Sequence, residues 1–188
     1  MSKCRMLLLC SPLVASLFGC AAPGQYRPEL ELAPPLNSYP LASGDRLRVI
    51  VFGQDQLSNS YAVDGSGHIS MPLIGPVPVN GRDPAAVEHE IAARLRRGYL
   101  RDPRVSVEVE AFRPFFVLGE VQSAGQFPYL EGMTARVAVA IAGGFSARGY
   151  QDAVDLTRVI DGEPVTGRVP LDTLVRPGDT LTARERIF

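Results

Sequence analysis

The sequence predicts an α+β fold of two small domains, because short strand patterns surround one helical pattern in each half of the chain. One helical pattern follows Asp83 and the other, shorter one follows Thr134. The length of 188 residues is enough for two such units. We expect a mixed sheet with one long helix in residues 39–111, and a second small sheet crossed by one helix in residues 112–188.

The helix of the first domain has a start, an apolar stripe and an end. Asp83 is a favourable N-cap residue, and Pro84 suits the first helical position because its missing N–H would have no partner there. An apolar residue recurs every four positions, which gives the helix one apolar face. The residues of that face are Val87, Ile91 and Leu95. Gly98 ends the pattern.

Strands are expected on both sides of this helix. Residues 46–52 alternate apolar and polar side chains after a turn at 43–45, and residues 104–110 alternate in the same way. Between them, residues 61–63 and 68–71 flank Asp64-Gly65-Ser66-Gly67, which is typical of a hairpin turn.

The second domain is organised around residues 115–121, a short apolar run bounded by Pro114 and a glycine turn. Residues 126–130 are predicted to return antiparallel to it, and Thr134 is predicted to cap a helix at 135–142. Gly143-Gly144 then ends the helix. Three further strands are expected at 153–160, 164–169 and 180–187.

A short pattern occurs once in each domain. Gly44-Asp45-x-Leu47 recurs as Gly178-Asp179-x-Leu181. Four residues are too few to indicate an internal repeat, so we interpret the pattern as two similar turns that lead into strands.

The N-terminus has the parts of a secretion signal. Lys3 and Arg5 precede an apolar stretch at 6–18 that is too short to span a bilayer. Gly19-Cys20 resembles the processing site of bacterial lipoproteins, which implies a signal peptide at 1–19 and acylation of Cys20; the alternative is an ordinary signal peptide with an incidental cysteine. Ala21 after the cysteine implies the outer membrane by the same analogy. The proline-rich residues 20–38 are interpreted as a tether.

The sequence shows no recognisable catalytic or metal-binding pattern. His68 and His89 lack metal-ligand spacing, and the three cysteines all lie in the first 20 residues. Asp64-Gly65-Ser66-Gly67 is neither a nucleophile elbow nor a phosphate loop, because no helix follows it. With a net charge of −1 and no basic block, the chain is not expected to bind nucleic acid. We expect no catalytic site, no metal and no cofactor.

Four residues of the second domain are candidates for binding or for a subunit interface. Arg113 and Glu120 flank the organising strand and are either exposed strand ends or part of an interface. Phe116 and Tyr129, with the neighbouring Phe115 and Phe127, could form a sugar-stacking platform, although aromatic residues at strand spacing are more often core residues.

Several ordered runs resemble the bacterial outer-membrane polysaccharide export family. YPLASGDRLRVIVFG, YAVDGSGHISMPLIGPV and RGYLRDPRVSVEV resemble its export-signature domain, and RPFFVLGEV, GQFPYLEGMT and AIAGGFSARG resemble its soluble-ligand-binding (SLBB) β-grasp domain. The resemblance covers residues 36–188 and implies that the second domain is β-grasp-like. The resemblance is to the short form of the family, which lacks the C-terminal pore helix of larger members.

The resemblance implies a periplasmic, outer-membrane-anchored ring or adaptor that conducts capsular polysaccharide or exopolysaccharide. It further implies a homo-oligomeric ring, an inner-membrane polysaccharide co-polymerase as partner, and a separate outer-membrane pore protein. Two alternatives stay open. One is a monomeric lipoprotein that binds a small ligand or glycan through its β-grasp domain. The other is a periplasmic glycan hydrolase, for which Asp152, Asp155 and Asp172 are the available acids.

Overall fold

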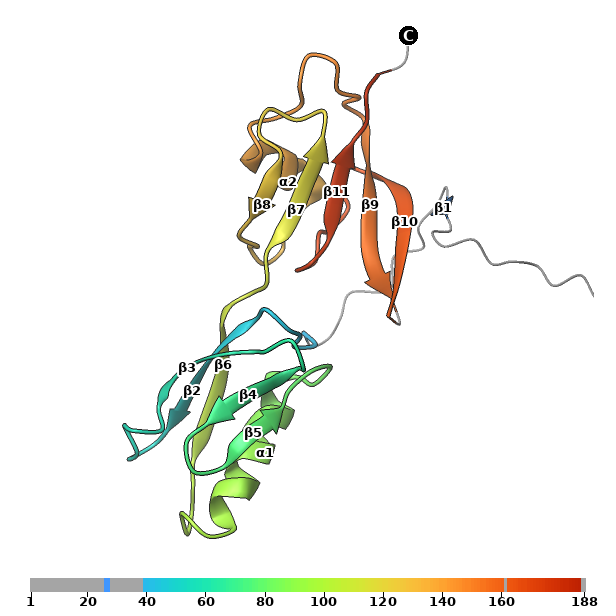
Figure 1. The fold of residues 1–188 in the computed structure, drawn as a ribbon. Helices are drawn as coiled ribbons and strands as arrows, with labels where there is room; N and C mark the ends of the chain where they lie inside the picture. Colours follow the sequence, from blue (N-terminus) through green and yellow to red (C-terminus); the bar gives the residue numbers. More distant parts are fainter. Residues whose placement is uncertain (1–25, 28–38, 161, 187–188) are drawn as a thin grey trace, which may run out of the picture.

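The computed structural model describes residues 26–27, 39–160 and 162–186. It places two domains at opposite ends of the molecule, joined by the segment between strands β6 (Val105–Ala111) and β7 (Phe115–Gly119) (Figure 1). The α+β class and the two-domain arrangement predicted from the sequence are confirmed. Cys20 and the predicted signal peptide lie outside the described residues.

The first domain contains five strands and one long helix. Strands β2 (Arg46–Val51), β3 (Asn59–Ala62) and β6 (Val105–Ala111) form an antiparallel sheet in the order β3-β2-β6. Strands β4 (His68–Met71) and β5 (Gly75–Pro78) form a separate antiparallel pair. The pairing of this domain is thus antiparallel in both sheets, where the sequence suggested one mixed sheet.

Helix α1 (Pro84–Arg96) begins as its sequence predicts. The Asp83 carboxylate accepts a hydrogen bond of 2.6 Å from the backbone N–H of Ala86. One side of the helix is fully buried against both sheets, and it consists of Val87, Ile91 and Leu95. Burying each such side chain contributes about 1.5–3 kcal/mol to stability, so the stripe is enough to fix the helix on the sheets.

The predicted hairpin around Asp64-Gly65-Ser66-Gly67 is wrong. The turn forms, with the Asp64 N–H donating to the carbonyl of His68 at 2.9 Å, but β3 and β4 do not pair. Instead β3 pairs with β2, and β4 pairs with β5 through the turn at 72–74. The strand β5 escaped prediction because Pro76 and Pro78 interrupt it, and prolines are tolerated only where a strand needs no N–H donor.

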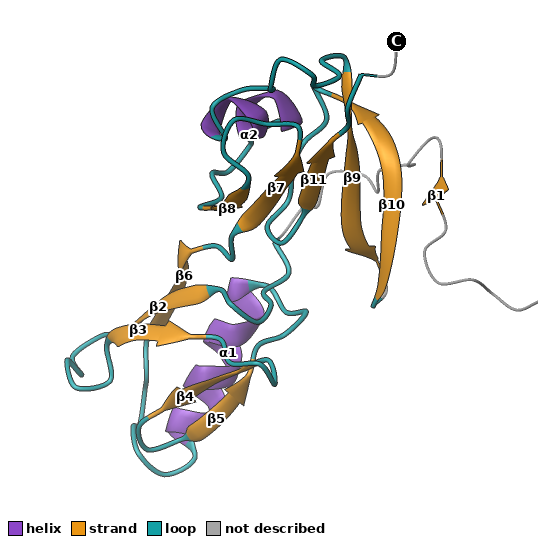
Figure 2. Cartoon of the chain, turned by 45° about the horizontal axis from the view of Figure 1, so that its top comes forward, coloured by secondary structure: helices purple, strands orange, loops and turns teal. Residues whose placement is uncertain are grey.

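The second domain is a six-stranded sheet with one helix. Its strands are β1 (Tyr26–Arg27), β7 (Phe115–Gly119), β8 (Gly125–Phe127), β9 (Ala153–Ile160), β10 (Glu163–Pro170) and β11 (Thr180–Ala183). They lie in the order β1-β10-β9-β11-β7-β8, with β1 parallel to β10, β11 parallel to β7, and the other pairs antiparallel. Helix α2 (Ala135–Ile141) lies across one face of this sheet (Figure 2).

The face under α2 forms the second core. Phe115, Val117, Leu156 and Leu181 are fully buried there. The helix contributes mainly small side chains to it, namely Ala135, Ala138 and Val139, so its backbone lies close to the sheet. The predicted strand at 115–121 is shorter than expected because Gly119, at φ +81°, bends the chain beside the carbonyl of Ala183.

One described part of the predicted tether is not free. Strand β1 (Tyr26–Arg27) pairs parallel with β10, with Tyr26 opposite Thr166. A strand of two residues is too short to show a hydrophobic periodicity, so no pattern in the sequence predicts it. Tyr26 and Arg27 therefore lie at the edge of the second domain, although the residues of the first domain follow them in the sequence.

Candidate functional site: the joint between the two domains

A cluster of charged and aromatic side chains lies where the two domains meet. Its first component is the carboxylate of Asp45, which is fully buried at the turn before β2. The hydroxyl of Tyr39 lies 2.9 Å from both carboxylate oxygens, and the N–H groups of Ala42 and Arg113 donate to them at 2.8 Å. A buried carboxylate with this many donors is a well-satisfied anchor.

Arg113 connects this anchor to the second domain. Its Nη1 donates to the Tyr39 hydroxyl at 3.0 Å and lies 3.5 Å from Asp45, while its Nε donates to the carbonyl of Pro177 at 3.1 Å. Arg113, predicted to be an exposed strand end or an interface residue, thus lies at the contact between the two domains of its own chain. Its side chain is 27% exposed there.

The two copies of the Gly-Asp pattern lie on either side of Arg113. A Cβ atom added to Gly44 would lie 3.3 Å from the Arg113 Cβ, and one added to Gly178 would lie 2.8 Å from its Nε. Both glycines also have positive φ angles, +94° and +85°, which L side chains rarely adopt. Each glycine therefore has two roles: it adopts the positive φ angle that its turn requires, and its lack of a side chain leaves space for Arg113.

The two turns use the same hydrogen bonds. In each, the aspartate carboxylate accepts from the N–H three residues earlier: from Ala42 to Asp45 at 2.8 Å, and from Arg176 to Asp179 at 2.7 Å. Each aspartate also meets an arginine, and Asp179 forms a buried two-point ion pair with Arg158 at 2.9 and 2.7 Å. The recurrence of the Gly-Asp pattern predicts two similar turns, but it does not predict that Arg113 lies between them.

Aromatic rings make a second connection between the domains. The ring of Phe112 packs edge-on against Tyr39, with centroids 4.9 Å apart, and against Tyr129 at 5.4 Å. Tyr39 belongs to the first domain and Tyr129 to the second, so Tyr129 contributes to the joint and not to an open sugar platform. Burial raises the pKa of the Tyr39 hydroxyl above its usual value; Arg113 opposes this rise and Asp45 adds to it.

Glu120 lies away from the joint, at the end of β7. Its carboxylate accepts from the Ser146 hydroxyl at 2.6 Å and pairs with Arg148 at 3.4 Å. These contacts fasten β7 to the loop that follows α2. Because Arg148 is 70% exposed, this pair contributes little to stability.

Phe116 is separated from the other aromatic candidates. Phe115 is fully buried and stacks near Phe127 with centroids 5.9 Å apart, whereas Phe116 points to the opposite face of the sheet and is 38% exposed. Phe127 and Tyr129 are half-buried against the core. The four aromatic residues therefore do not form one platform, because alternate strand residues face opposite sides.

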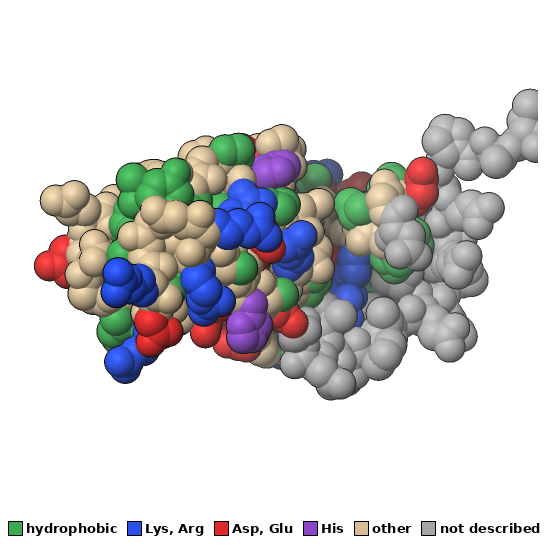
Figure 3. All heavy atoms as spheres, turned by 90° about the horizontal axis from the view of Figure 1, so that it is seen from below, with side chains coloured by type: hydrophobic (Ala, Val, Ile, Leu, Met, Phe, Trp, Pro, Cys, Tyr) green, Lys and Arg blue, Asp and Glu red, His purple; other side chains and the backbone are tan. Residues whose placement is uncertain are grey.

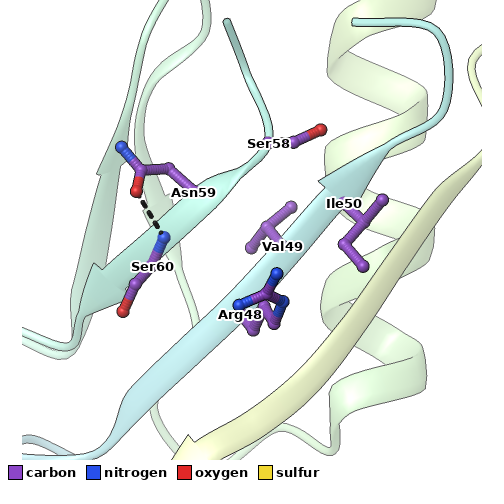
Figure 4. A pocket seen from close by; sticks show the side chains of 6 residues that line it. All are labelled: Arg48, Val49, Ile50, Ser58, Asn59 and Ser60. Carbon is purple, nitrogen blue, oxygen red and sulfur yellow. Dashed lines mark hydrogen bonds between the residues drawn. The ribbon is translucent and has the colours of Figure 1, made fainter. Parts of the chain in front are cut away.

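The first domain has two shallow hollows. The first, about 170 Å³, opens between β2 and β3 and is lined by Arg48, Val49, Ile50, Ser58, Asn59 and Ser60 (Figure 4). It is smaller than the roughly 300–1,000 Å³ of typical small-molecule sites. The second contains Leu73, Arg94 and Tyr99; seen from below, arginine and apolar side chains mingle on this end of the domain (Figure 3).

Within the described ranges, no group of three or more His, Cys, Asp or Glu side chains is placed to hold a metal ion. Neither α1 nor α2 has the length and apolar character that a membrane-spanning helix needs, and the described residues contain no other helix.

Comparison with known proteins identifies both domains. Residues 33–110 match the family described as "Polysaccharide biosynthesis/export protein", and residues 114–169 match the SLBB domain. Over 120 residues the chain is 34% identical to the exopolysaccharide production protein ExoF of Rhizobium meliloti (strain 1021). That alignment covers 57% of this chain but only 28% of the relative.

Proposed function

Because the chain belongs to the polysaccharide export family, we propose that it is a periplasmic component of exopolysaccharide or capsule export, anchored to the outer membrane. It acts as a ring or adaptor that conducts the polysaccharide across the envelope. The matched family is one of export proteins and not of enzymes, in agreement with the expectation of no catalytic step, so the hydrolase alternative is set aside.

The observation that carries this proposal is the joint at Arg113. A ring of identical subunits closes only if each subunit presents its two sides at a constant angle. Arg113 is held by Asp45 of the first domain and by Pro177 of the second, and the Phe112 ring bridges Tyr39 and Tyr129. These contacts support a subunit whose two domains move as one body.

Strand β1 supports an orientation for the anchored subunit. If Cys20 carries the lipid, the six residues from it to Tyr26 span at most about 20 Å. Because Tyr26 pairs with β10, the second domain would lie next to the outer membrane and the first domain would point into the periplasm. An inner-membrane polysaccharide co-polymerase would then meet the first domain, and a separate pore protein would adjoin the second.

Anchoring is tested by replacing Cys20 with serine in the full chain expressed in a Gram-negative host. We expect the Cys20→Ser variant to lack the acyl mass and to lose the association with the outer-membrane fraction that the unmodified protein shows. A Cys20→Ser protein that stays in that fraction would contradict lipid anchoring.

Assembly is tested by the native mass of the acylated protein in mild detergent, measured by light scattering or mass spectrometry. A single closed species of many subunits is the expected result. A monomer at every concentration, with or without the acyl chain, would contradict a ring of this chain alone.

The second candidate function is a monomeric lipoprotein that binds a glycan through its second domain. The exposed Phe116, on the sheet face opposite α2, is the observation that favours it. It predicts saturable saccharide binding by a protein of monomeric mass, and the same native-mass measurement separates it from the ring.

A further inference from the structure

The six-stranded sheet has one face that no other element of the described chain covers. The strand pairing aligns two rows of side chains across it. The first row consists of Gln126, Phe116, Thr180, Thr157 and Thr166, and the second of Leu118, Thr182, Asp155 and Arg168. Phe116 and Leu118 are 38% and 44% exposed, so within these two rows the β7 end is apolar and the β9–β10 end is polar.

Asp155 is the unusual member of the polar side. Its residue is only 7% exposed, and its Oδ1 atom is buried without a hydrogen bond from the protein. The other carboxylate oxygen accepts from Arg184 Nε. An acceptor that is buried and unbonded loses the hydrogen bonds it had in water, which makes a donor at this position favourable.

Arg168 is placed to uncover that oxygen. Its Nε lies 3.6 Å from Oδ1, an ion pair beyond hydrogen-bonding distance, and its guanidinium also lies 5.9 Å from the centre of the Tyr150 ring. Its side chain is 42% exposed, so a small rotation would free Oδ1 toward the open face. Arg168 and Arg184 both contact this one aspartate, each through its Nε atom.

We propose that this uncovered face binds an acidic saccharide, with the sugar carboxylate on Arg168, a sugar hydroxyl donating to Asp155 Oδ1, and a sugar ring against Phe116 and Leu118. The side chain of Arg168 is 42% exposed, and a planar guanidinium can hold a carboxylate at two points. The apolar strip suits the C–H face of a pyranose ring. This inference deepens the proposed function by naming the class of saccharide that is carried.

The dimensions of the face suit a short oligosaccharide. From β7 to β10 there are three strand spacings, or about 14 Å at 4.8 Å each, and the two rows lie about 7 Å apart along the strands. The threonine hydroxyls between the two ends can donate or accept, as sugar hydroxyls do; those of Thr157 and Thr166 already share a hydrogen bond of 2.8 Å. A trisaccharide would therefore reach both the apolar strip and the arginine.

The test is a titration of the full chain in mild detergent with trigalacturonic acid, followed by calorimetry. Its methyl ester is the ligand control, because it keeps the rings and removes the charge. The variant is Arg168→Gln, and Arg48→Gln is the matched control, since Arg48 is also a strand residue in an exposed ion pair, with Glu110 in the first domain.

We expect saturable binding of the acid and about ten-fold weaker binding of the ester. The Arg168→Gln variant should bind the acid with about ten-fold lower affinity, which is the effect of losing one charge-assisted hydrogen bond. Arg48→Gln should bind as the unmodified chain does. Equal affinity for acid and ester, an equal loss in both variants, or no saturation up to about 10 mM would overturn the inference.

A separate measurement keeps this inference distinct from the proposed function. Deleting the chain in its host and measuring exported polysaccharide tests export without reference to the sheet face. If export stops but trigalacturonic acid does not bind, the export function stands and the saccharide site is wrong. If binding follows the expected pattern while export is unchanged by the deletion, the saccharide site stands and the export function is wrong.

Discussion

Replacing Arg113 with methionine should loosen the joint between the domains without unfolding either domain. The variant loses three contacts of the guanidinium: to Tyr39 at 3.0 Å, to Pro177 at 3.1 Å and to Asp45 at 3.5 Å. Because the side chain is 27% exposed, water compensates part of this loss, and we expect a total cost of about 2 kcal/mol. Asp45 keeps its donors from Tyr39, Ala42 and the Arg113 backbone, so the first domain retains its anchor.

The assay combines small-angle scattering with hydrogen exchange on the full chain. Arg113→Met should broaden the distribution of molecular dimensions and speed exchange of the Arg113 amide, which is bonded to Asp45. Arg48→Met serves as a control, because its ion pair with Glu110 at 3.9 Å is exposed and joins two strands of the first domain only. Unchanged scattering and unchanged exchange in Arg113→Met would refute the argument that this side chain holds the domains together.

Three further predictions concern the same joint. Arg158→Met should lower the free energy of unfolding of the second domain by about 3–5 kcal/mol in urea titrations, since it leaves the buried Asp179 carboxylate without its ion pair; a loss below about 1 kcal/mol would contradict this. Tyr39→Phe should remove a pH dependence: because the folded-state pKa of Tyr39 lies above the usual value of 10.0, the unmodified protein should lose stability as pH rises above about 10, and the variant should lose less. Gly178→Ala should cost more stability than Gly162→Ala, because both have a φ of +85° but only the former would bring a Cβ against Arg113; equal costs would show that the contact is unimportant.

The sequence was sufficient where local chemistry decides the structure. Helix α1 was predicted correctly because Asp83, Pro84 and the buried stripe all act within the helix itself. Strand β6 was predicted because its residues alternate between the core and solvent. Local chemistry does not predict the partner of β3, because the glycine turn at 64–67 is also compatible with a hairpin. The pairing of β3 with β2 depends on tertiary packing.

The candidate residues show the same division. That Phe115 is a core residue follows from the apolar run around it, and the structure buries it completely. That Arg113 lies between two turns 134 positions apart in sequence, at Gly44 and Gly178, depends on the packing of the two domains, which no local pattern encodes. The sequence could state that the two turns were alike, but it could not state that they face each other.

The joint and strand β1 together constrain how such a subunit could work. If β1 keeps the second domain close to a lipid anchor, any movement at the joint would be magnified at the far end of the first domain. A flexible residue between Ala111 and Phe115 would then allow the first domain to take many orientations, which would oppose ring closure. In this short connection, Phe112 packs between two tyrosines and Arg113 lies between two turns, so both residues contact both domains. The remaining residue is Pro114, and its own ring restricts its φ angle. Rigidity at this point is therefore a property of the connection itself, and it is the property that an assembly of repeated subunits requires.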